Sequence, residues 1–271
     1  FSTAGYGTTT AGSITNPTVA LYSDTSTFNL GGGTIPASTS SYITSTSWYN
    51  LNVTGWVNLG GNCTIQNSLN IYSGGTLSDL NTYTITSYAT ALSGSLITGD
   101  YTLASGKIFI LNSGANWEVY KNKTITINGI LSCNASVNNK VIIKPQEADT
   151  YYGINVASGT TLDVNGLMIK GINTSGLVLG SGSTINKLNY VDFRQGQAGG
   201  TYLNVLNGMT KTLNGCTFDD ISSGTNVTAK NSTKLSFTNY TVGSNLDSVE
   251  AGSSVMWLGE TYVTISLDKN E

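Results

Sequence analysis

The sequence contains few charged residues and no histidine. Lys, Arg, Asp and Glu make up 10% of its 271 residues, and Arg194 is the only arginine. Binding to nucleic acid depends on clustered Lys and Arg that release counterions from phosphates, whereas this chain carries a net charge of −3. We therefore expect no nucleic-acid partner.

Long apolar runs and paired cysteines are also missing. No apolar stretch reaches the length of about 18 residues that a membrane span requires, so none is predicted in this chain. Cys63, Cys133 and Cys216 are odd in number and widely spaced, which excludes a dense disulfide framework and a Cys-x-x-Cys metal site. We expect buried thiols and no cofactor or metal. The opening FSTAGYG, without Met or a signal-peptide core, is typical of a mature or excised segment.

The residue types that dominate the composition favour β-structure. Gly, Ser, Thr and Asn dominate, and 39% of the residues are apolar, which is enough to build a core. Many of the apolar residues are β-branched or aromatic, the types enriched in strands, and no segment shows helical periodicity. The sequence therefore predicts an all-β fold.

Turn residues recur along the chain at intervals of 20 to 26 residues. Gly and Asn adopt the left-handed backbone conformation more readily than other residues, so one can replace the other at a turn. The row comprises Gly74, Gly94, Gly114, Asn138, Gly159, Gly182, Gly208, Asn231 and Gly252. We interpret it as one turn repeated once per structural unit.

A second row begins six to eight residues after several of these turns. It contains NGLMI from Asn165, NYVDF from Asn189, NGCTF from Asn214 and NYTVG from Asn239. The second and fourth residues after each Asn are mostly apolar, an alternation typical of a strand with one buried face. We expect these Asn side chains to form a ladder, each amide donating to the next.

A turn–strand unit of about 23 residues cannot bury its apolar face alone, whereas stacked units can. The sequence therefore predicts a single-stranded, right-handed parallel β-helix of nine or ten coils over residues 46–271. Residues 1–45 are Gly-, Thr- and Ser-rich and are predicted to form an irregular N-terminal cap or arm. TYVTISL, residues 261–267, alternates and is predicted to pair as a closing strand.

Over residues 65–255 the chain resembles the right-handed parallel β-helix proteins. The resemblance rests on the turns SGGTL, SGTTL and SGSTI and on the Asn row. That scaffold carries lyases, hydrolases, adhesins and passive filaments, so it implies a fold and not a function. In its Ser-, Thr-, Asn- and Tyr-rich character the chain also resembles the tāpirins, surface proteins of bacteria that degrade plant biomass. This second resemblance implies attachment of a cell surface to cellulose without hydrolysis.

The charged residues offer one candidate catalytic site. Lys170, Arg194 and Asp219 share one position on successive predicted coils, with Asp192 and Asp220 nearby. A β-helix lyase would need a cationic base beside acids that hold calcium. Opposite charges on neighbouring strands also pair for structural reasons alone, and we favour this interpretation. The histidine of pectin-active β-helix hydrolases is absent, and we expect no enzymatic activity.

Aromatic residues give the main functional hypothesis. Tyr190 and Tyr240 each follow an Asn of the row and are predicted to point outward, with Gly215 leaving a gap between them. Two coils span roughly 10 Å, about one disaccharide of an extended β-glucan, and aromatic rings stack well on sugar faces. The other candidate sugar-binding residues are Trp48, Trp56, Tyr151 and Tyr152. We expect an extracellular, cell-surface adhesin for an insoluble polysaccharide, most simply cellulose.

Other functions stay open at this point. A structural subunit of an extracellular filament or surface layer, formed by self-association, is the main alternative, and a polysaccharide lyase is a further one. Thr-x-Thr segments at 84–86 and 124–126 do not recur in register, which argues against an ice-binding surface. Eight N-x-S/T sequons are expected by chance in a chain this rich in Asn, Ser and Thr, so they do not indicate a glycoprotein coat.

Overall fold

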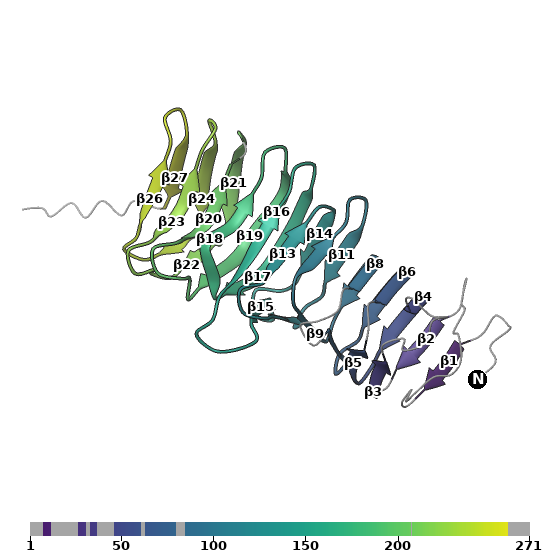
Figure 1. Cartoon of the computed structure of the whole chain (residues 1–271). Helices are drawn as coiled ribbons and strands as arrows, with labels where there is room; N and C mark the ends of the chain where they lie inside the picture. Colours follow the sequence, from purple (N-terminus) through teal and green to yellow (C-terminus); the bar gives the residue numbers. More distant parts are fainter. Residues whose placement is uncertain are drawn as a thin grey trace, which may run out of the picture.

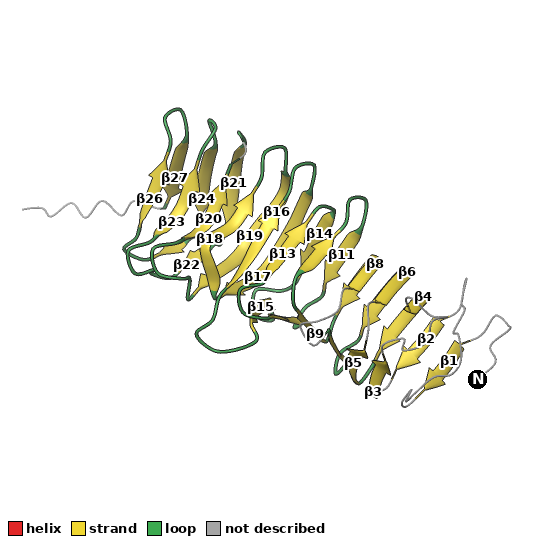
Figure 2. Cartoon of the chain, in the orientation of Figure 1, coloured by secondary structure: helices red, strands yellow, loops and turns green. Residues whose placement is uncertain are grey.

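The chain folds into a parallel β-solenoid of about eight turns (Figure 1). This computed structural model describes residues 8–11, 27–30, 33–36, 46–60, 63–79, 85–206 and 208–259, and the side chains of residues 50–57, 64–79, 89–206 and 208–259. These residues form strands and connecting loops, and the described part of the chain contains no helix (Figure 2). Consequently, this part of the chain has no helix that could cross a membrane.

Each complete coil has three sides, and equivalent strands of successive coils pair in parallel. Side 1 comprises β1 (Thr8–Ala11), β2 (Thr27–Leu30), β4 (Thr46–Val53), β6 (Cys63–Ile71), β8 (Ile85–Leu92), β11 (Ile108–Leu111), β14 (Ile130–Asn134), the first halves of β17 (Thr161–Lys170) and β19 (Thr184–Arg194), β21 (Thr210–Asn214), β24 (Lys234–Thr238) and β27 (Ser254–Leu258).

The other two sides are built in the same way. Side 2 comprises β3 (Gly33–Pro36), β5 (Trp56–Gly60), β7 (Thr76–Ser78), β9 (Ser95–Thr98), β12 (Asn116–Val119), β15 (Val141–Pro145), the second halves of β17 and β19, β22 (Thr217–Phe218) and β25 (Thr241–Val242). Side 3 comprises β10 (Tyr101–Leu103), β13 (Thr124–Ile127), β16 (Tyr152–Val156), β18 (Ile172–Leu179), β20 (Thr201–Val205), β23 (Thr225–Ala229) and β26 (Leu246–Val249).

The predicted alternation is confirmed in the strands that follow the Asn row. Leu167 and Ile169 are buried in β17, and Val191 and Phe193 are buried in β19. Their neighbours Lys170 and Arg194 are only partly buried, because successive side chains of a strand point to opposite faces. The interior is therefore filled from all three sides of each coil.

The interpretation of the Gly and Asn row as one repeated turn is wrong, because its members occupy two different corners of the coil. Gly74, Gly94 and Gly114 lie between side 1 and side 2, where the chain leaves β6, β8 and β11. Gly159 and Gly182 lie between side 3 and side 1, before β17 and β19. Both corners use left-handed residues, with φ of 77° at Gly114 and 76° at Gly159, so similar spacing joined two rows into one. The structure has about eight turns, compared with the nine or ten coils predicted for residues 46–271.

The N-terminal strands join the same stack. β1 pairs with β2, β2 with β4, and β3 with β5, all in parallel. These strands of residues 1–45 thus extend the coils, and the other residues of the predicted cap or arm lie outside the described part of the chain. The predicted closing strand at residues 261–267 also lies outside it.

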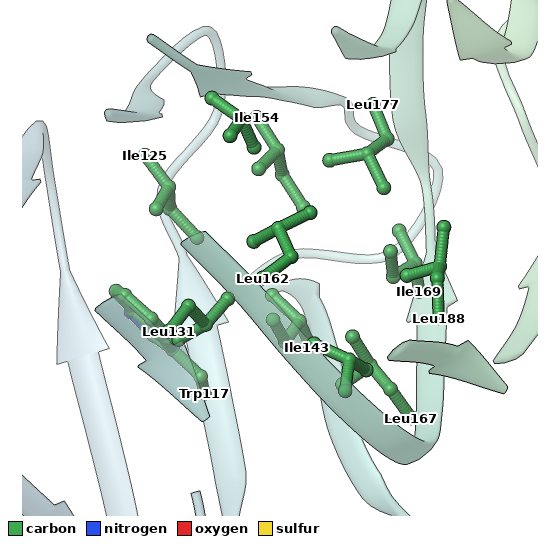
Figure 3. Close-up of a pocket in the computed structure, with 12 residues that line it drawn as sticks. Trp117, Ile125, Leu131, Ile143, Ile154, Leu162, Leu167, Ile169, Leu177 and Leu188 are labelled. Carbon is green, nitrogen blue, oxygen red and sulfur yellow. The ribbon is translucent and has the colours of Figure 1, made fainter. Parts of the chain in front are cut away.

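The interior of the middle coils is aliphatic and closed. A small space of about 20 Å³ is lined by Trp117 and by Ile, Leu and Val side chains, which point towards one another in Figure 3. Trp117 Nε1 donates to Thr98 Oγ1 at 2.8 Å, so its one polar atom is satisfied. A dry space of this size accommodates no sugar or cofactor. Ligands of that size must therefore bind outside the coils.

Candidate functional site

The corner between side 1 and side 2 carries a continuous polar row, which we call the Asn corner. Pairing places Asn134 beside Asn165, Asn165 beside Asn189, and Asn214 beside Thr238. The row continues towards the N-terminus, where Asn112 Nδ2 donates to Ser93 Oγ at 2.9 Å. The Asn corner consists of Ser93, Asn112, Asn134, Asn165, Asn189, Asn214 and Thr238.

The hydrogen bonds along the Asn corner differ from a uniform amide ladder. Asn239 Nδ2 donates to Asn214 Oδ1 at 2.7 Å, as predicted for one amide above another. Asn165 Nδ2 instead donates to the carbonyl oxygen of Ala135 at 2.9 Å, and the backbone N–H of Asn214 donates to Asn189 Oδ1 at 3.2 Å. The amides thus link neighbouring coils through both backbone and side-chain partners.

Tyr190 occupies an unusual backbone conformation next to the Asn corner. Its φ is 53°, in the left-handed region, and the equivalent residues of the adjacent coils are Gly166 and Gly215, with φ of 79° and 69°. A left-handed conformation costs a residue with a side chain roughly 1–2 kcal/mol, and in a bulky residue it is an outlier. Outliers of this kind cluster at functional sites, which makes Tyr190 the leading candidate for a binding residue.

The ring of Tyr190 lies over Gly215, so the predicted gap there is filled. A Cβ placed on Gly215 would come within 2.4 Å of Tyr190 Cδ1 and 2.6 Å of Cε1. The side chain is half-buried, because the sheet covers part of it. Gly215 therefore provides the space in which the tyrosine ring rests.

Tyr240 does not share the position of Tyr190, and the prediction that both rings point outward from one row is wrong. Pairing of Asn214 with Thr238 and of Thr217 with Thr241 places Tyr240 level with Cys216, which is buried. Its ring packs on Trp257, with ring centroids 4.9 Å apart, and against the core. The one-residue shift turns the side chain from the outer face to the inner face.

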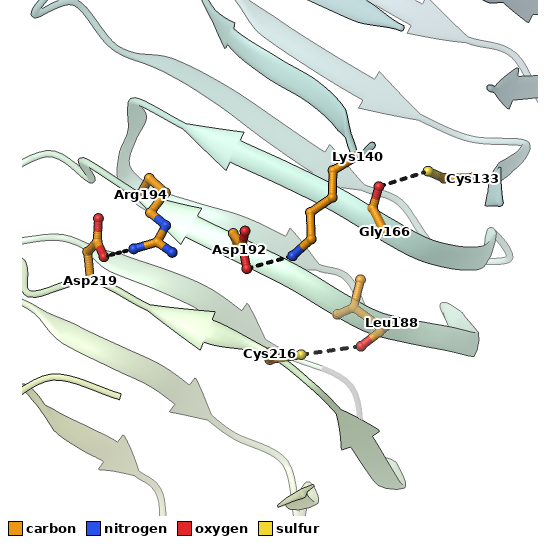
Figure 4. A network of polar contacts seen from close by, with 8 residues as sticks. All are labelled: Cys133, Lys140, Gly166, Leu188, Asp192, Arg194, Cys216 and Asp219. Carbon is orange, nitrogen blue, oxygen red and sulfur yellow. Dashed lines mark hydrogen bonds and ion pairs between the residues drawn. The ribbon is translucent and has the colours of Figure 1, made fainter. Parts of the chain in front are cut away.

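Two ion pairs lie on side 2 near Tyr190 (Figure 4). Lys140 Nζ is 2.8 Å from Asp192 Oδ1, and only 13% and 12% of these side chains are exposed. Arg194 pairs with Asp219, as cross-strand pairing of opposite charges predicts. Asp220 lies apart from these pairs and accepts hydrogen bonds from the backbone N–H and hydroxyl of Ser244. Asp192 and Arg194 of the predicted cluster thus belong to separate ion pairs, and Lys170 and Asp220 belong to neither.

Two of the three cysteines line the interior beneath this region. Cys133 and Cys216 are buried and free, as predicted, and Cys216 Sγ donates to the carbonyl oxygen of Leu188 at 3.4 Å. Burial raises the pKa of each thiol to about 11. The side chain of Cys63 lies outside the described residues. No group of three or more His, Cys, Asp or Glu suited to a metal ion occurs in the described part of the chain.

The remaining predicted sugar-binding residues separate into three groups. Tyr152 is fully buried, and its hydroxyl donates to the carbonyl oxygen of Ile143 at 3.0 Å, so its assignment to a surface site is wrong. Burial also raises the pKa of its hydroxyl. Tyr151 is half-buried just before β16. Trp48 lies in β4, but its side chain is outside the described residues.

Trp56 is the most exposed of the predicted residues whose side chains are described, and a tyrosine that the sequence analysis missed lies on the next coil. Trp56 is 57% exposed at the start of β5, directly after the corner, and Tyr72 is 47% exposed on the next coil. The backbone N–H of Tyr72 donates to the carbonyl oxygen of Val53, which places Tyr72 in line with the Asn corner. The sequence feature that could have identified Tyr72 is its position directly after the alternating strand that ends at Ile71.

Lys140 was also missed. It precedes β15, far in the sequence from Asp192, and only the stacking of coils brings the two side chains together.

Comparisons with protein-family models, with curated proteins and with solved structures found no match to this chain. No family therefore supports the resemblance to the tāpirins.

Proposed function

We propose that this protein is a non-catalytic extracellular adhesin of a cell surface that binds an insoluble plant polysaccharide such as cellulose. The contact surface is the Asn corner together with the aromatic residues beside it, Trp56, Tyr72 and Tyr190. The conformation of Tyr190 carries the proposal. A strained tyrosine at a position that neighbouring coils give to glycine is explained if its ring serves a ligand.

The arrangement of the aromatic residues supports an extended ligand. Tyr72 and Asn189 are separated by five coil steps, about 24 Å at the usual strand spacing of 4.8 Å. The hydroxyl and amide groups of the Asn corner lie between the two ends and match the hydrogen-bonding groups of sugars. Single rings contribute about 1 kcal/mol each, and an insoluble polymer multiplies such weak contacts by avidity.

The test separates binding from stability at Tyr190. In Tyr190→Gly the ring is lost and the left-handed strain is relieved, so the free energy of unfolding should stay level or rise. Adsorption to cellulose should fall about fivefold, since 1 kcal/mol corresponds to that factor. Tyr120→Ala is the matched control, because Tyr120 is also half-buried but lies in the turn after β12.

Adsorption isotherms on cellulose, xylan and chitin, together with denaturation curves, measure both effects. If the unmodified protein adsorbs to none of these polymers, the adhesin proposal fails. If it adsorbs but Tyr190→Gly and Tyr120→Ala behave alike, the proposal fails for the Asn corner, and Trp56 or Tyr151 becomes the next candidate.

The absence of catalysis is part of the proposal. Arg194 and Asp192, the residues most suited to lyase chemistry, are each held in an ion pair. We expect no reducing-sugar or unsaturated product from plant polysaccharides, with or without calcium. A product signal that disappears in Asp192→Asn or Arg194→Gln would contradict this and identify an active site.

A filament subunit is the second candidate function, favoured by the C-terminal end of the coil stack. Leu246 is 80% exposed on β26, and Met256 and Leu258 are exposed on β27, the last described strands of sides 3 and 1. Exposed edge strands with apolar side chains favour addition of further strands. A molecular mass that rises with protein concentration, and that Leu246→Asp reduces, would support this function.

A further inference from the structure

Side 2 carries a row of five charged residues on five successive coils. Glu118 pairs in register with Lys144, and Lys170 with Arg194. The register of β15 with β17 brings Lys144 beside Lys170, and that of β19 with β22 brings Arg194 beside Asp219. Three cations, Lys144, Lys170 and Arg194, therefore lie at steps of about 4.8 Å, and we call them the cation row.

The two outer cations are neutralised from the ends of the row. Lys144 Nζ is 3.1 Å from Glu118 Oε1, on the preceding coil. Arg194 forms its ion pair with Asp219, on the following coil. Both partners lie away from Lys170, which forms no ion pair among the residues that the structure describes. The five charges of the row sum to +1, and Lys170 is the cation of the row that forms no ion pair in the described part of the chain.

Another acid on side 2, Asp192, is already engaged. Asp192 lies two residues before Arg194 on the same strand, and it pairs with Lys140 at 2.8 Å. Like charges on directly opposite strand positions destabilise a sheet, so a row of three cations is unfavourable without an anion. Lys170 is partly exposed and can reach a ligand. The row therefore has the charge and the access of an anion-binding site.

We infer that Lys170, flanked by Lys144 and Arg194, binds the carboxylate of a uronic acid residue in a polysaccharide. This inference rests on the proposed function, because it assigns a substrate class to the same adhesive surface. The net charge of the row, +1, matches one carboxylate, whereas a phosphate dianion would overcompensate it. The protein should then bind an acidic plant polysaccharide more tightly than a neutral one of the same backbone.

The position of the cation row relative to Tyr190 fits one polymer. Tyr190 and Arg194 lie on β19 four residues apart, which corresponds to about 13 Å along the strand. A short run of pyranose rings covers this distance across side 2. The ring of Tyr190 would stack on one sugar while Lys170 pairs with the carboxylate of another.

Polygalacturonate and its methyl ester form the test pair, because they share a backbone and differ in whether the carboxylates are charged. Binding is measured by affinity electrophoresis at low salt for the unmodified protein, Lys170→Gln, Lys230→Gln and Tyr190→Gly. Lys230→Gln is the matched control: Lys230 is exposed in the turn after β23, and it too forms no ion pair in the described part of the chain.

The unmodified protein should bind polygalacturonate more tightly than the ester. Of the two lysine variants, only Lys170→Gln should lower the ratio of the two affinities, by about fivefold, which is the upper range for an exposed ion pair. Equal affinity for both polymers, or equal effects of Lys170→Gln and Lys230→Gln, would overturn the inference. Tighter binding to dextran sulfate that also depends on Lys170 would overturn the assignment to a carboxylate. Tyr190-dependent binding to the ester alone would leave the proposed function intact, whereas no binding to these polymers or to insoluble cellulose, xylan and chitin would remove both.

Discussion

Two coils of the solenoid contain the same dipeptide, Asn-Tyr, and use it in opposite ways. In the coil of β19, Asn189 lies in the Asn corner and Tyr190 turns outward in a left-handed conformation. In the coil of β24 and β25, Asn239 itself is left-handed, with φ of 49°, and Tyr240 packs inward on Trp257. The left-handed residue thus moves by one position between the two coils.

The difference shows that the corner selects a backbone conformation rather than a residue type. Gly166, Tyr190, Gly215 and Asn239 all adopt positive φ at the same step of the coil. Where Asn takes that step, the following tyrosine packs inward against the core. Where tyrosine takes it, the ring stays at the surface and the backbone is strained. Variants of the two coils should therefore separate effects on stability from effects on binding.

The largest expected change in stability follows Tyr240→Ala. Removing a buried aromatic side chain costs about 3–5 kcal/mol, and Tyr240 is partly buried, so we expect a loss at the lower end, about 3 kcal/mol. Adsorption to polysaccharide should not change. Chemical denaturation and adsorption isotherms measure the two quantities, and reduced adsorption with unchanged stability would return Tyr240 to the binding surface.

Gly215→Ala should perturb both stability and binding. The new Cβ would adopt positive φ and would meet the ring of Tyr190 at 2.4 Å, so the cost should exceed the roughly 1–2 kcal/mol of the backbone alone. Gly159→Ala is the matched control, because Gly159 has φ of 76° and an added Cβ meets no atom within 4 Å. Equal losses of stability in the two variants would show that the ring of Tyr190 does not rest on Gly215.

Asn214→Ala tests the link between the two coils. Asn214 Oδ1 accepts hydrogen bonds from Thr238 Oγ1 at 3.1 Å and from Asn239 Nδ2 at 2.7 Å. Both donors lose a partner at a half-buried corner, and we expect a loss of about 1 kcal/mol. Asn138→Ala, in an exposed turn, serves as the control. Thermal midpoints that agree between the two variants would mean that Asn214 does not hold the corner together.

The smallest effect concerns Asp247, whose carboxylate accepts a hydrogen bond from Trp257 Nε1 at 2.7 Å and so supports the inward position of Tyr240. Burial raises the pKa of Asp247 above its ordinary range, although the bond from Trp257 lowers it. The folded state therefore holds this proton to higher pH than the unfolded state, and the associated stability is lost as pH rises above about 4.

Asp247→Asn removes this titration and keeps an acceptor for Trp257. The variant should gain stability relative to the unmodified protein as the pH is raised from 4 to 7. Thermal midpoints measured across that range test the expectation. Two profiles that remain parallel would show that Asp247 does not lose a proton at a cost to the fold.

The fold was accessible from the sequence because burial alternates along each strand. The pattern after Asn165 and Asn189 predicts that Leu167, Ile169, Val191 and Phe193 point inward, and all four are buried. The Asn corner was predicted in part, at Asn165, Asn189 and Asn214, whereas Asn112 and Asn134 were missed. Ser93 and Thr238 continue it with hydroxyl groups and carry no such signal.

The site was less accessible, because it depends on register and on contacts between distant segments. The shift of Tyr240 arises from a single residue in the corner, which leaves the Asn-Tyr pattern unchanged. The partnership of Lys140 with Asp192 depends on the lengths of the intervening coils. Tyr152 illustrates a third reason, since an aromatic residue beside a polar loop can equally begin a buried strand.

The reactivity of the two buried thiols reports how often the surrounding coils open. With pKa values raised to about 11, Cys133 and Cys216 hold almost no thiolate at neutral pH, and their burial keeps alkylating reagents out. Modification then requires the surrounding coils to separate, so its rate follows the free energy of local opening. Modification of Cys133 reports opening of the coil that contains β14, and modification of Cys216 reports opening of the coil that contains β22. Their relative labelling rates would show from which end the solenoid unravels.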